Sequence, residues 1–288
     1  MSFFTAKSFV FNGINSEDFD VIIAWLNSDV DVSTNGLNRE VVKSQSNKRK
    51  TRDNIYGTET TEPIVFTFSL VKINGEEISR PESIRINQWL TSSSLPQLLK
   101  FNDYDSYRLH YYAVCTQIND VVIGGRLVGK ELRLETNSPY AFMDKIEKNF
   151  DVTDTQTFYI NNTSDTYDGY FYPTITINTN TNDKVVIENV TDKKSVTLDF
   201  TNVSADENGN KTVILSSENM ILSDRNNDLL YLNTVGWNKN YQSYVSSTDS
   251  YMTNLYWFRL LNGLNEIKVT GSCNFKIECE FTRKAGCC

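Results

Sequence analysis

The chain has 288 residues, of which 39% are apolar, 12% aromatic and 22% charged, and its formal net charge is −8. This apolar share can fill a core, which excludes disorder throughout the chain, and the length allows two domains. The negative charge excludes free nucleic acid as a sequence-specific partner, because a phosphate backbone binds basic surfaces. No apolar run approaches the roughly 20 residues that cross a bilayer, so we predict no membrane partner.

The first segment with a clear pattern is SFVFNGINSEDFDVII, which begins at Ser8. Phe9 and Phe11 alternate with polar or smaller residues, as in a half-buried strand, and Asn12-Gly13 is a turn signal. A second strand is expected over Asp18 to Leu26. The residues before Ser8 lack the apolar core of a signal peptide, so we expect synthesis and folding in a cytoplasm.

Residues 27–61 are polar or mixed in charge and contain the basic run KRKTRD. Such a run is commonly a solvated loop, and the sharper interpretation is a contact with an acidic protein neighbour. The candidate interface residues are Lys48, Arg49, Lys50 and Arg52.

EPIVFTFSLVKING, which begins at Glu62, is the strongest strand of the first half, and its Asn-Gly pair predicts a turn. One helix follows. Ser79 and Glu82 have the spacing of a capping box, and Pro81 suits the first turn. Apolar residues at helical spacing, including Trp89, then predict a single buried face.

Two further strands are expected over Tyr107 to Ile118 and Glu131 to Thr136, before Pro139 ends the strand signal. We place the domain boundary near residue 150, which gives an N-terminal domain of residues 1–150 and a C-terminal domain of residues 151–288. The predicted N-terminal domain is a β-sandwich with one α-helix and a β-hairpin.

The second half is almost entirely strand signal, with turns such as Asn208-Gly209 and Asn262-Gly263 between the strands. This spacing predicts an antiparallel β-sandwich, so the fold class is mainly β. The expected strands are Thr157 to Ile160, Thr174 to Asn178, Val185 to Glu188, Ser195 to Phe200, Thr212 to Leu215, Leu229 to Leu232, Tyr256 to Leu261, Glu266 to Thr270 and Phe275 to Phe281.

The sequence offers no catalytic constellation. His110 is the only histidine and lies within a predicted strand, so we interpret it as structural, and there is no nucleophile elbow, zinc motif or P-loop. The acidic stretches Asp206–Asn210 and Asp224–Asp228 lack a bidentate glutamate at the last position of a calcium loop and are interpreted as turns. We therefore predict no metal, no cofactor and no enzymatic activity.

The five cysteines are an odd number, which argues against a disulfide framework. Cys273 and Cys279 would lie about 20 Å apart on one strand, too far to bond to each other. Cys115 is expected to be a small core residue, and Cys287-Cys288 an exposed tail.

Aromatic residues also occur in the polar stretch Gly236 to Thr253, which reads as a long loop. They either fill a core or interface, or form a platform that stacks on sugar. The second interpretation makes the chain a carbohydrate-binding module that acts in attachment to a host surface. The candidate sugar or partner contacts are Trp237, Tyr241, Tyr244 and Tyr251.

Several motifs together resemble one family, the distal tail proteins of long-tailed bacteriophages and prophages of Gram-positive bacteria. FVFNGINSEDFDVII is similar to the opening hairpin of that family, and EPIVFTFSLVKI, followed by a helix that ends in Trp89-Leu90, is similar to its core segment. LKFNDYDSYRLHYYAV and ELRLETNSPYAF resemble its next strands. GLNEIKVTGSCNFKIECEFTRK resembles the hairpin that ends its galectin-like sandwich.

The resemblance implies a structural virion protein that is assembled in the host cytoplasm. Its N-terminal domain would form a homo-hexameric ring between the major tail-tube protein and the tail-tip protein, and DNA would pass through the ring. Its galectin-like C-terminal domain would dock adsorption proteins, including a receptor-binding protein. A peptidoglycan hydrolase of the tail tip is an alternative that the single histidine disfavours.

Overall fold

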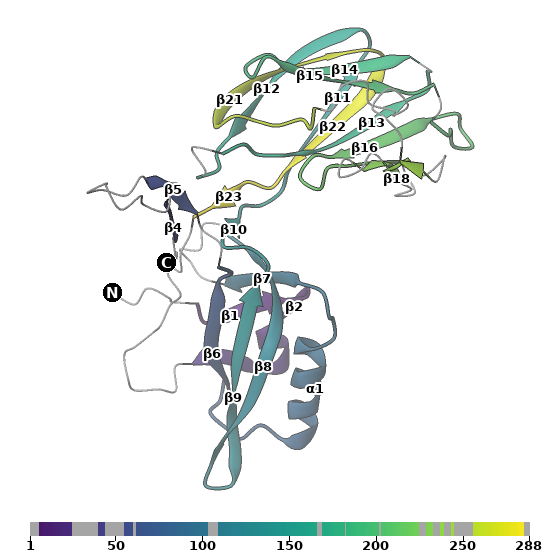
Figure 1. Ribbon diagram of the computed structural model, residues 1–288. Coiled ribbons are helices and arrows are strands. Elements are labelled where there is room, and N and C mark those ends of the chain that lie inside the picture. Colours follow the sequence, from purple (N-terminus) through teal and green to yellow (C-terminus); the bar gives the residue numbers. More distant parts are fainter. Residues whose placement is uncertain are drawn as a thin grey trace. The chain divides into compact units, whose positions relative to one another are not determined.

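The structure is a computed structural model, and Figure 1 shows its helix and strands. It describes residues 6–24, 40–43, 55–59, 62–102, 109–165, 169–181, 183–201, 203–224, 229–232, 237–238, 243–244 and 256–284. The fold is mainly β with one α-helix, and the named strands pair antiparallel, which confirms the predicted fold class. No helix in the described ranges has the length and apolarity to cross a membrane.

The chain divides into two compact units, Met1–Asp144 with Thr282–Cys288, and Lys145–Phe281. The last described residues therefore return to the first unit. There, β23 (Thr282–Arg283) pairs with β10 (Ala141–Phe142). A single boundary near residue 150 does not describe this return, which joins segments 140 residues apart in the sequence.

The first unit is built on a seven-stranded sheet in the order β2-β1-β7-β8-β9-β6-β3. Its strands are β1 (Ser8–Phe11), β2 (Ile14–Asn15), β3 (Val21–Ala24), β6 (Val65–Lys72), β7 (Gln97–Asn102), β8 (Tyr111–Ile123) and β9 (Arg126–Thr136). The sheet curls, because the Ile23 amide donates to the Lys7 carbonyl and so brings β3 to the residue before β1.

The predicted turns are where the sequence placed them. Asn12 and Gly13 link β1 to β2 with φ of 51° and 76°, the left-handed conformation that a two-residue hairpin requires. A 3-10 helix, η1 (Ser16–Phe19), follows. It occupies part of the expected second strand, which begins only at Val21.

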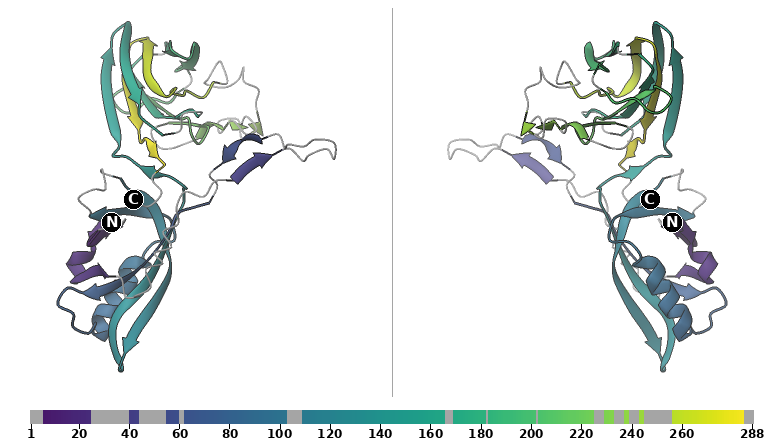
Figure 2. Two further views of the ribbon diagram at one scale, coloured as in Figure 1. Left: turned by 90° about the vertical axis from the view of Figure 1, so that its left-hand side faces the viewer. Right: turned by 90° about the vertical axis from the view of Figure 1, so that its right-hand side faces the viewer.

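Helix α1 (Arg80–Leu90) has the predicted cap. The Glu82 carboxylate accepts a hydrogen bond from the Ser79 amide at 2.7 Å, and it also pairs with Lys72 at 2.9 Å. The Lys72 ammonium is the main cause that lowers the pKa of Glu82 to about 2. The helix lies on the concave side of the β8–β9 hairpin (Figure 2).

The core of the first unit is an aromatic cluster around Trp89 from α1. The Trp89 ring stacks on Phe19 with centroids 4.7 Å apart and on Phe9 at 5.5 Å, and its Nε1 donates to the Phe11 carbonyl at 2.9 Å. Phe68, Leu132 and their neighbours on alternate strand positions complete the cluster from the sheet. The opposite face of the sheet is therefore left without a covering layer from these elements.

A two-stranded ribbon is formed by β4 (Glu40–Lys43) and β5 (Ile55–Glu59), and within the described residues neither strand joins another sheet. The sequence did not predict these strands, because the segment is polar and mixed in charge. Figure 2 shows the ribbon as an element of its own.

The second unit is a sandwich of two facing sheets (Figure 1). The eight-stranded sheet has the order β11 (Ile146–Val152), β22 (Cys273–Cys279), β13 (Thr174–Thr179), β16 (Lys211–Ser216), β17 (Ile221–Asp224), β18 (Leu229–Leu232), β19 (Trp237–Asn238) and β20 (Ser243–Tyr244). The four-stranded sheet has the order β12 (Thr155–Asn162), β21 (Gly263–Thr270), β14 (Lys184–Asn189) and β15 (Lys194–Asp199).

One expected strand of the second unit is wrong. Tyr256 to Leu261 has no ladder, and only Leu260 forms an isolated bridge, with Phe171. Amide side chains satisfy much of this backbone instead. Asn189 donates to the Arg259 carbonyl, and Asn265 both donates to the Leu261 carbonyl and accepts from the Leu261 amide.

Candidate interaction surfaces

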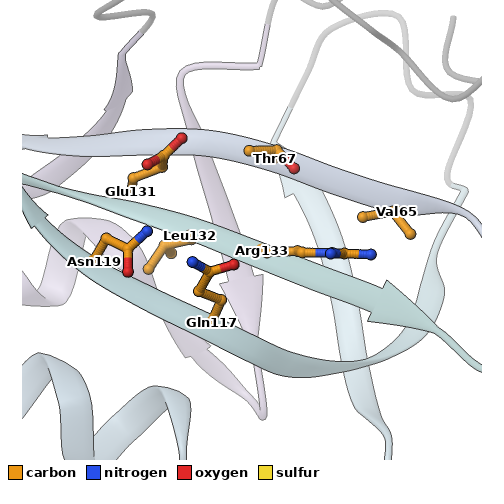
Figure 3. A pocket seen from close by; sticks show the side chains of 7 residues that line it. All are labelled: Val65, Thr67, Gln117, Asn119, Glu131, Leu132 and Arg133. Atoms are coloured by element: carbon orange, nitrogen blue, oxygen red, sulfur yellow. The ribbon is translucent and has the colours of Figure 1, made fainter.

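The first candidate surface is a polar hollow of about 340 Å³ on the outward face of the first unit, opposite the aromatic core. Figure 3 shows its lining side chains projecting from β6, β8 and β9. The ionic groups are Glu131 and Arg133, and amides and a hydroxyl supply most of the rest. The lining residues are Val65, Thr67, Gln117, Asn119, Glu131, Leu132 and Arg133.

A β-bulge shapes this hollow. The pairing of β8 with β9 shifts between Cys115 and Gln117, so Thr116 is an extra residue, and its hydroxyl donates to the Arg133 carbonyl at 3.2 Å. A bulge re-aims the side chains that follow it. The hollow can form hydrogen bonds with a protein or a solute through its charged groups, its amides and its hydroxyl.

The second candidate surface is an open edge of β8. Strand β7 pairs with β8 only from Tyr111 to Ala113, whereas β9 follows the other side of β8 to Ile123. Within the described residues, no strand pairs with the outer edge from Val114 to Ile123. Val122 and Ile123 at its end are 57% and 64% exposed, so apolar side chains as well as backbone groups face solvent.

The third candidate is an ionic cluster in the second unit. Arg259 donates from Nε to Asp192 Oδ2 at 2.7 Å and from a terminal nitrogen to Oδ1 at 3.2 Å, and its guanidinium lies 3.5 Å from the centroid of the Tyr170 ring. Burial opposes ionisation of Asp192, but hydrogen bonds from Arg259 and Tyr256 outweigh it and lower the pKa of Asp192. This cluster anchors the ladder-free segment that begins at Tyr256, so its geometry indicates a structural role.

The structure shows where several residues considered for catalysis or metal binding lie. His110 is buried, and its ring lies against those of Tyr112 and Phe142. No group of metal-ligating residues occurs in the part of the chain that the structure describes. Asp206 forms a turn in which its carboxylate accepts from the amides of Asn208 and Asn210. Of the second acidic stretch, residues 225–228 lie outside the described ranges.

The described cysteines are free thiols. Cys273 and Cys279 share β22 as expected and are buried, and Cys115 packs at the margin of the first core. Burial raises the pKa of Cys115 and of Cys273 to about 11 and that of Cys279 to about 12, so all three stay protonated at neutral pH. Cys287 and Cys288 lie outside the described residues.

Only some of the residues predicted to contact a partner or a sugar are among those that the structure describes. Lys48, Arg49, Lys50 and Arg52 lie outside the described residues, in the sequence that joins β4 to β5. Tyr241 and Tyr251 also lie outside them. Trp237 and Tyr244 are cross-strand partners in the backbone ladder of β19 and β20, so the stretch expected as a long loop contains two short strands. The sequence missed the open edge of β8, since pairing partners are not visible in a strand pattern.

Comparisons with known proteins define the class. Residues 4–138 match a family model described as "Phage tail protein N-terminal domain", and residues 140–249 match one described as "Phage tail C-terminal domain". The two matches follow each other in order and cover most of the chain. This chain belongs to that family of phage tail proteins.

Among solved structures, the chain is similar to the Dit protein of phage SPP1, whose title calls it "a Paradigm of Hub Adsorption Apparatus in Gram-positive Infecting Phages". The identity is 11%, the TM-score is 0.57, and the match covers 96% of this chain and all of that one. The chain is also similar to a chain of the phage P2 baseplate, with 9% identity, a TM-score of 0.51, and 98% and 99% of the two chains covered. No curated protein sequence matches the chain.

Proposed function

We propose that this phage tail protein is a structural hub that joins the tail tube to the tail tip or baseplate. In this proposal the first unit forms a homo-hexameric ring in the virion, and the second, galectin-like unit carries adsorption or receptor-binding proteins. The ring is assembled in the host cytoplasm, binds no specific nucleic acid sequence and catalyses no reaction.

The observation that supports this proposal most strongly is the fold shared with the SPP1 hub protein over 96% of the chain, together with the two family matches in the same order. Among the described residues, the first unit also offers two surfaces to a neighbouring copy: the outer edge of β8, which has no strand partner there, and the sheet face opposite the aromatic core. A closed ring uses two different surfaces of each copy, and it hides edges that would otherwise promote aggregation.

The test combines the solution mass by light scattering with a gene deletion. We expect a mass of six subunits, with rings in negative-stain images of the same peak. Deletion of the gene from the phage or prophage that encodes it should leave tubes without tips, and expression of the chain in trans should restore them. Normal infectious tails after deletion would overturn the proposal.

The basic run between β4 and β5 is retained as a candidate contact with a neighbouring copy or with the tail tube, because four of its five positions from Lys48 to Arg52 are cationic. Reversal of these charges to glutamate should weaken assembly and make the residual assembly less sensitive to salt. Unchanged ring formation and tube attachment would remove this assignment.

A second candidate function is carbohydrate binding by the second unit. The observation in its favour is the cross-strand position of Trp237 and Tyr244, which places two aromatic residues at the end of the eight-stranded sheet. Binding of the full chain to a glycan array would support this function if Trp237→Ala abolishes the binding. A folded chain that binds no glycan on the array would count against it.

A further inference from the structure

The polar hollow on the outward face of the first unit is lined by side chains that bind little within the described structure. Thr67, Gln117, Asn119 and Glu131 form no side-chain hydrogen bond or ion pair with another described residue. The Arg133 guanidinium lies 3.8 Å from the Glu135 carboxylate, which is long for an ion pair, and the two side chains are 48% and 41% exposed. The polar groups of the lining can therefore bind an external partner.

These polar groups form two rows across the sheet. In the first row, Arg133 of β9 is the cross-strand partner of Thr67 in β6 and of Gln117 in β8. In the second row, Glu131 of β9 is the partner of Asn119 in β8. Residues two apart on a strand point to the same face, so a row with a cation and a row with an anion lie roughly 7 Å apart on one face. Figure 3 shows these side chains along the three strands.

The spacing and the chemistry of the two rows match an extended polypeptide. Side chains two residues apart in an extended segment project to the same side, again roughly 7 Å apart. Arg133 can bind a carboxylate through two parallel N–H donors, and Glu131 can accept from an ammonium or a guanidinium. The amides of Gln117 and Asn119 each offer donors and an acceptor, which is what the peptide groups between the charged side chains require.

We propose that the hollow binds an extended segment of another protein in which an acidic and a basic residue are two positions apart. The acidic side chain lies over the row of Arg133, and the basic side chain lies over the row of Glu131. The inference rests on the proposed hub function only for the origin of the segment, which belongs to a neighbouring protein of the tail.

The lining favours this occupant over other ligands. Its one cation and one anion leave it without net charge, whereas a phosphate backbone binds a basic surface. Among the described lining residues only Val65 and Leu132 are apolar, whereas most pockets for small molecules are lined mainly by apolar and aromatic side chains. The volume of about 340 Å³ is at the lower end of the range for ligand sites, which suits a short segment.

The first experiment uses a synthetic peptide that repeats Glu-Thr-Lys-Thr, so that acidic and basic side chains alternate on one side of the extended chain. The matched control peptide repeats Glu-Lys-Thr-Thr, which has the same composition but places the two charges on opposite sides. Binding of the labelled peptides to the full chain is measured by fluorescence anisotropy at low salt, because salt screens charge pairs. We expect the alternating peptide to bind about tenfold more tightly than the control. Equal affinity, or no binding of either peptide, would overturn the proposal.

The second experiment reverses the charges of the hollow. Arg133→Glu and Glu131→Arg each leave two rows of like charge, so each should weaken binding of the alternating peptide about tenfold. The double variant again has one row of each sign. Because the peptide repeats its charges, we expect the double variant to recover most of the affinity. The control is Lys268→Glu, which reverses an exposed charge on a strand of the second unit and should leave the affinity unchanged. Circular dichroism checks that every variant is folded.

The outcomes separate this site from the hub function. A folded double variant that does not recover binding would show that the charge pattern is not recognised, and the proposal would be wrong. A changed oligomeric state in Arg133→Glu, with unchanged peptide affinity, would show that a second copy of the chain covers the hollow, which also contradicts it. Neither result decides the hub function, which is tested by the gene deletion with the unchanged chain.

Discussion

The two units cover an antiparallel sheet in different ways. The first places one helix and a cluster of aromatic rings on its sheet, and no described strand pairs with the outer edge of β8 from Val114 to Ile123. The second places sheet against sheet and satisfies its ladder-free segment with buried amides and one ion pair. Among the described residues, backbone groups of β8 are therefore left without a strand partner in the first unit, whereas side chains of the second unit satisfy much of the backbone of its irregular segment.

The largest effect is expected in the aromatic core of the first unit. Trp89→Ala removes a ring that is 4% exposed and its hydrogen bond to Phe11, and we expect a loss of about 3–5 kcal/mol in the free energy of unfolding. Hydrogen exchange should accelerate in peptides of the first unit only. The control is Ile84→Ala on the exposed face of the same helix. Equal acceleration in both units would show that they unfold together.

In the second unit, the next largest loss of stability is expected at a buried polar residue, Asn265. Asn265 is fully buried and hydrogen-bonds to Leu261, Gly263 and Asn189. Asn265→Ala leaves these groups unsatisfied, so we expect a loss of about 2–3 kcal/mol, with faster hydrogen exchange confined to the second unit. Asn161→Ala, at an exposed position of the same unit, is the control. A neutral result for Asn265→Ala would mean that water replaces the amide.

The sequence predicts local features of the fold, but not those that depend on contacts between distant residues. The cap at Ser79 and Glu82 and the turn at Asn12-Gly13 are local patterns, and both were predicted correctly. Asn265 and the failed strand from Tyr256 to Leu261 depend on contacts with Asn189, which is 76 residues from Asn265. Periodicity shows that a segment is apolar, but not whether a strand or an amide side chain will satisfy its backbone.

The same limit applies to the candidate surfaces. The basic run from Lys48 and the aromatic residues from Gly236 to Thr253 are conspicuous in the composition of the sequence. Their side chains lie outside what the structure describes. The outer edge of β8 and the β4–β5 ribbon carry no unusual composition. Both surfaces are defined by which strands lie next to each other in the sheets, and this strand order depends on pairing between segments that are distant in the sequence.

A smaller effect is expected at the ionic cluster of the second unit. Asp192→Asn keeps the shape but removes the charge that Arg259 binds, so we expect a loss of about 2 kcal/mol at neutral pH. The folded pKa of Asp192 is lowered, so its stabilisation is present above the unfolded pKa of about 4 and is lost as the pH falls through the folded pKa. Urea unfolding at several pH values should show the two proteins converge in acid. Asp183→Asn is the exposed control, and a gap independent of pH would contradict the ionic explanation.

The smallest effect is expected at the start of α1. Glu82→Gln weakens the ion pair with Lys72 and the bond from the Ser79 amide, so the first unit should lose a little stability and the second none. Because the pKa of Glu82 is lowered to about 2, the difference from the unchanged protein should be full above pH about 4 and fade as the pH falls toward 2. Glu77→Gln is the control, since the contact of Glu77 with Arg126 is 3.9 Å long and both side chains are mostly exposed. An equal loss from both variants would assign the effect to net charge instead of the cap. A loss specific to Glu82 would show that the start of the helix, and with it the cover of the aromatic core, depends on the bonds of Glu82 to Lys72 of β6 and to the Ser79 amide.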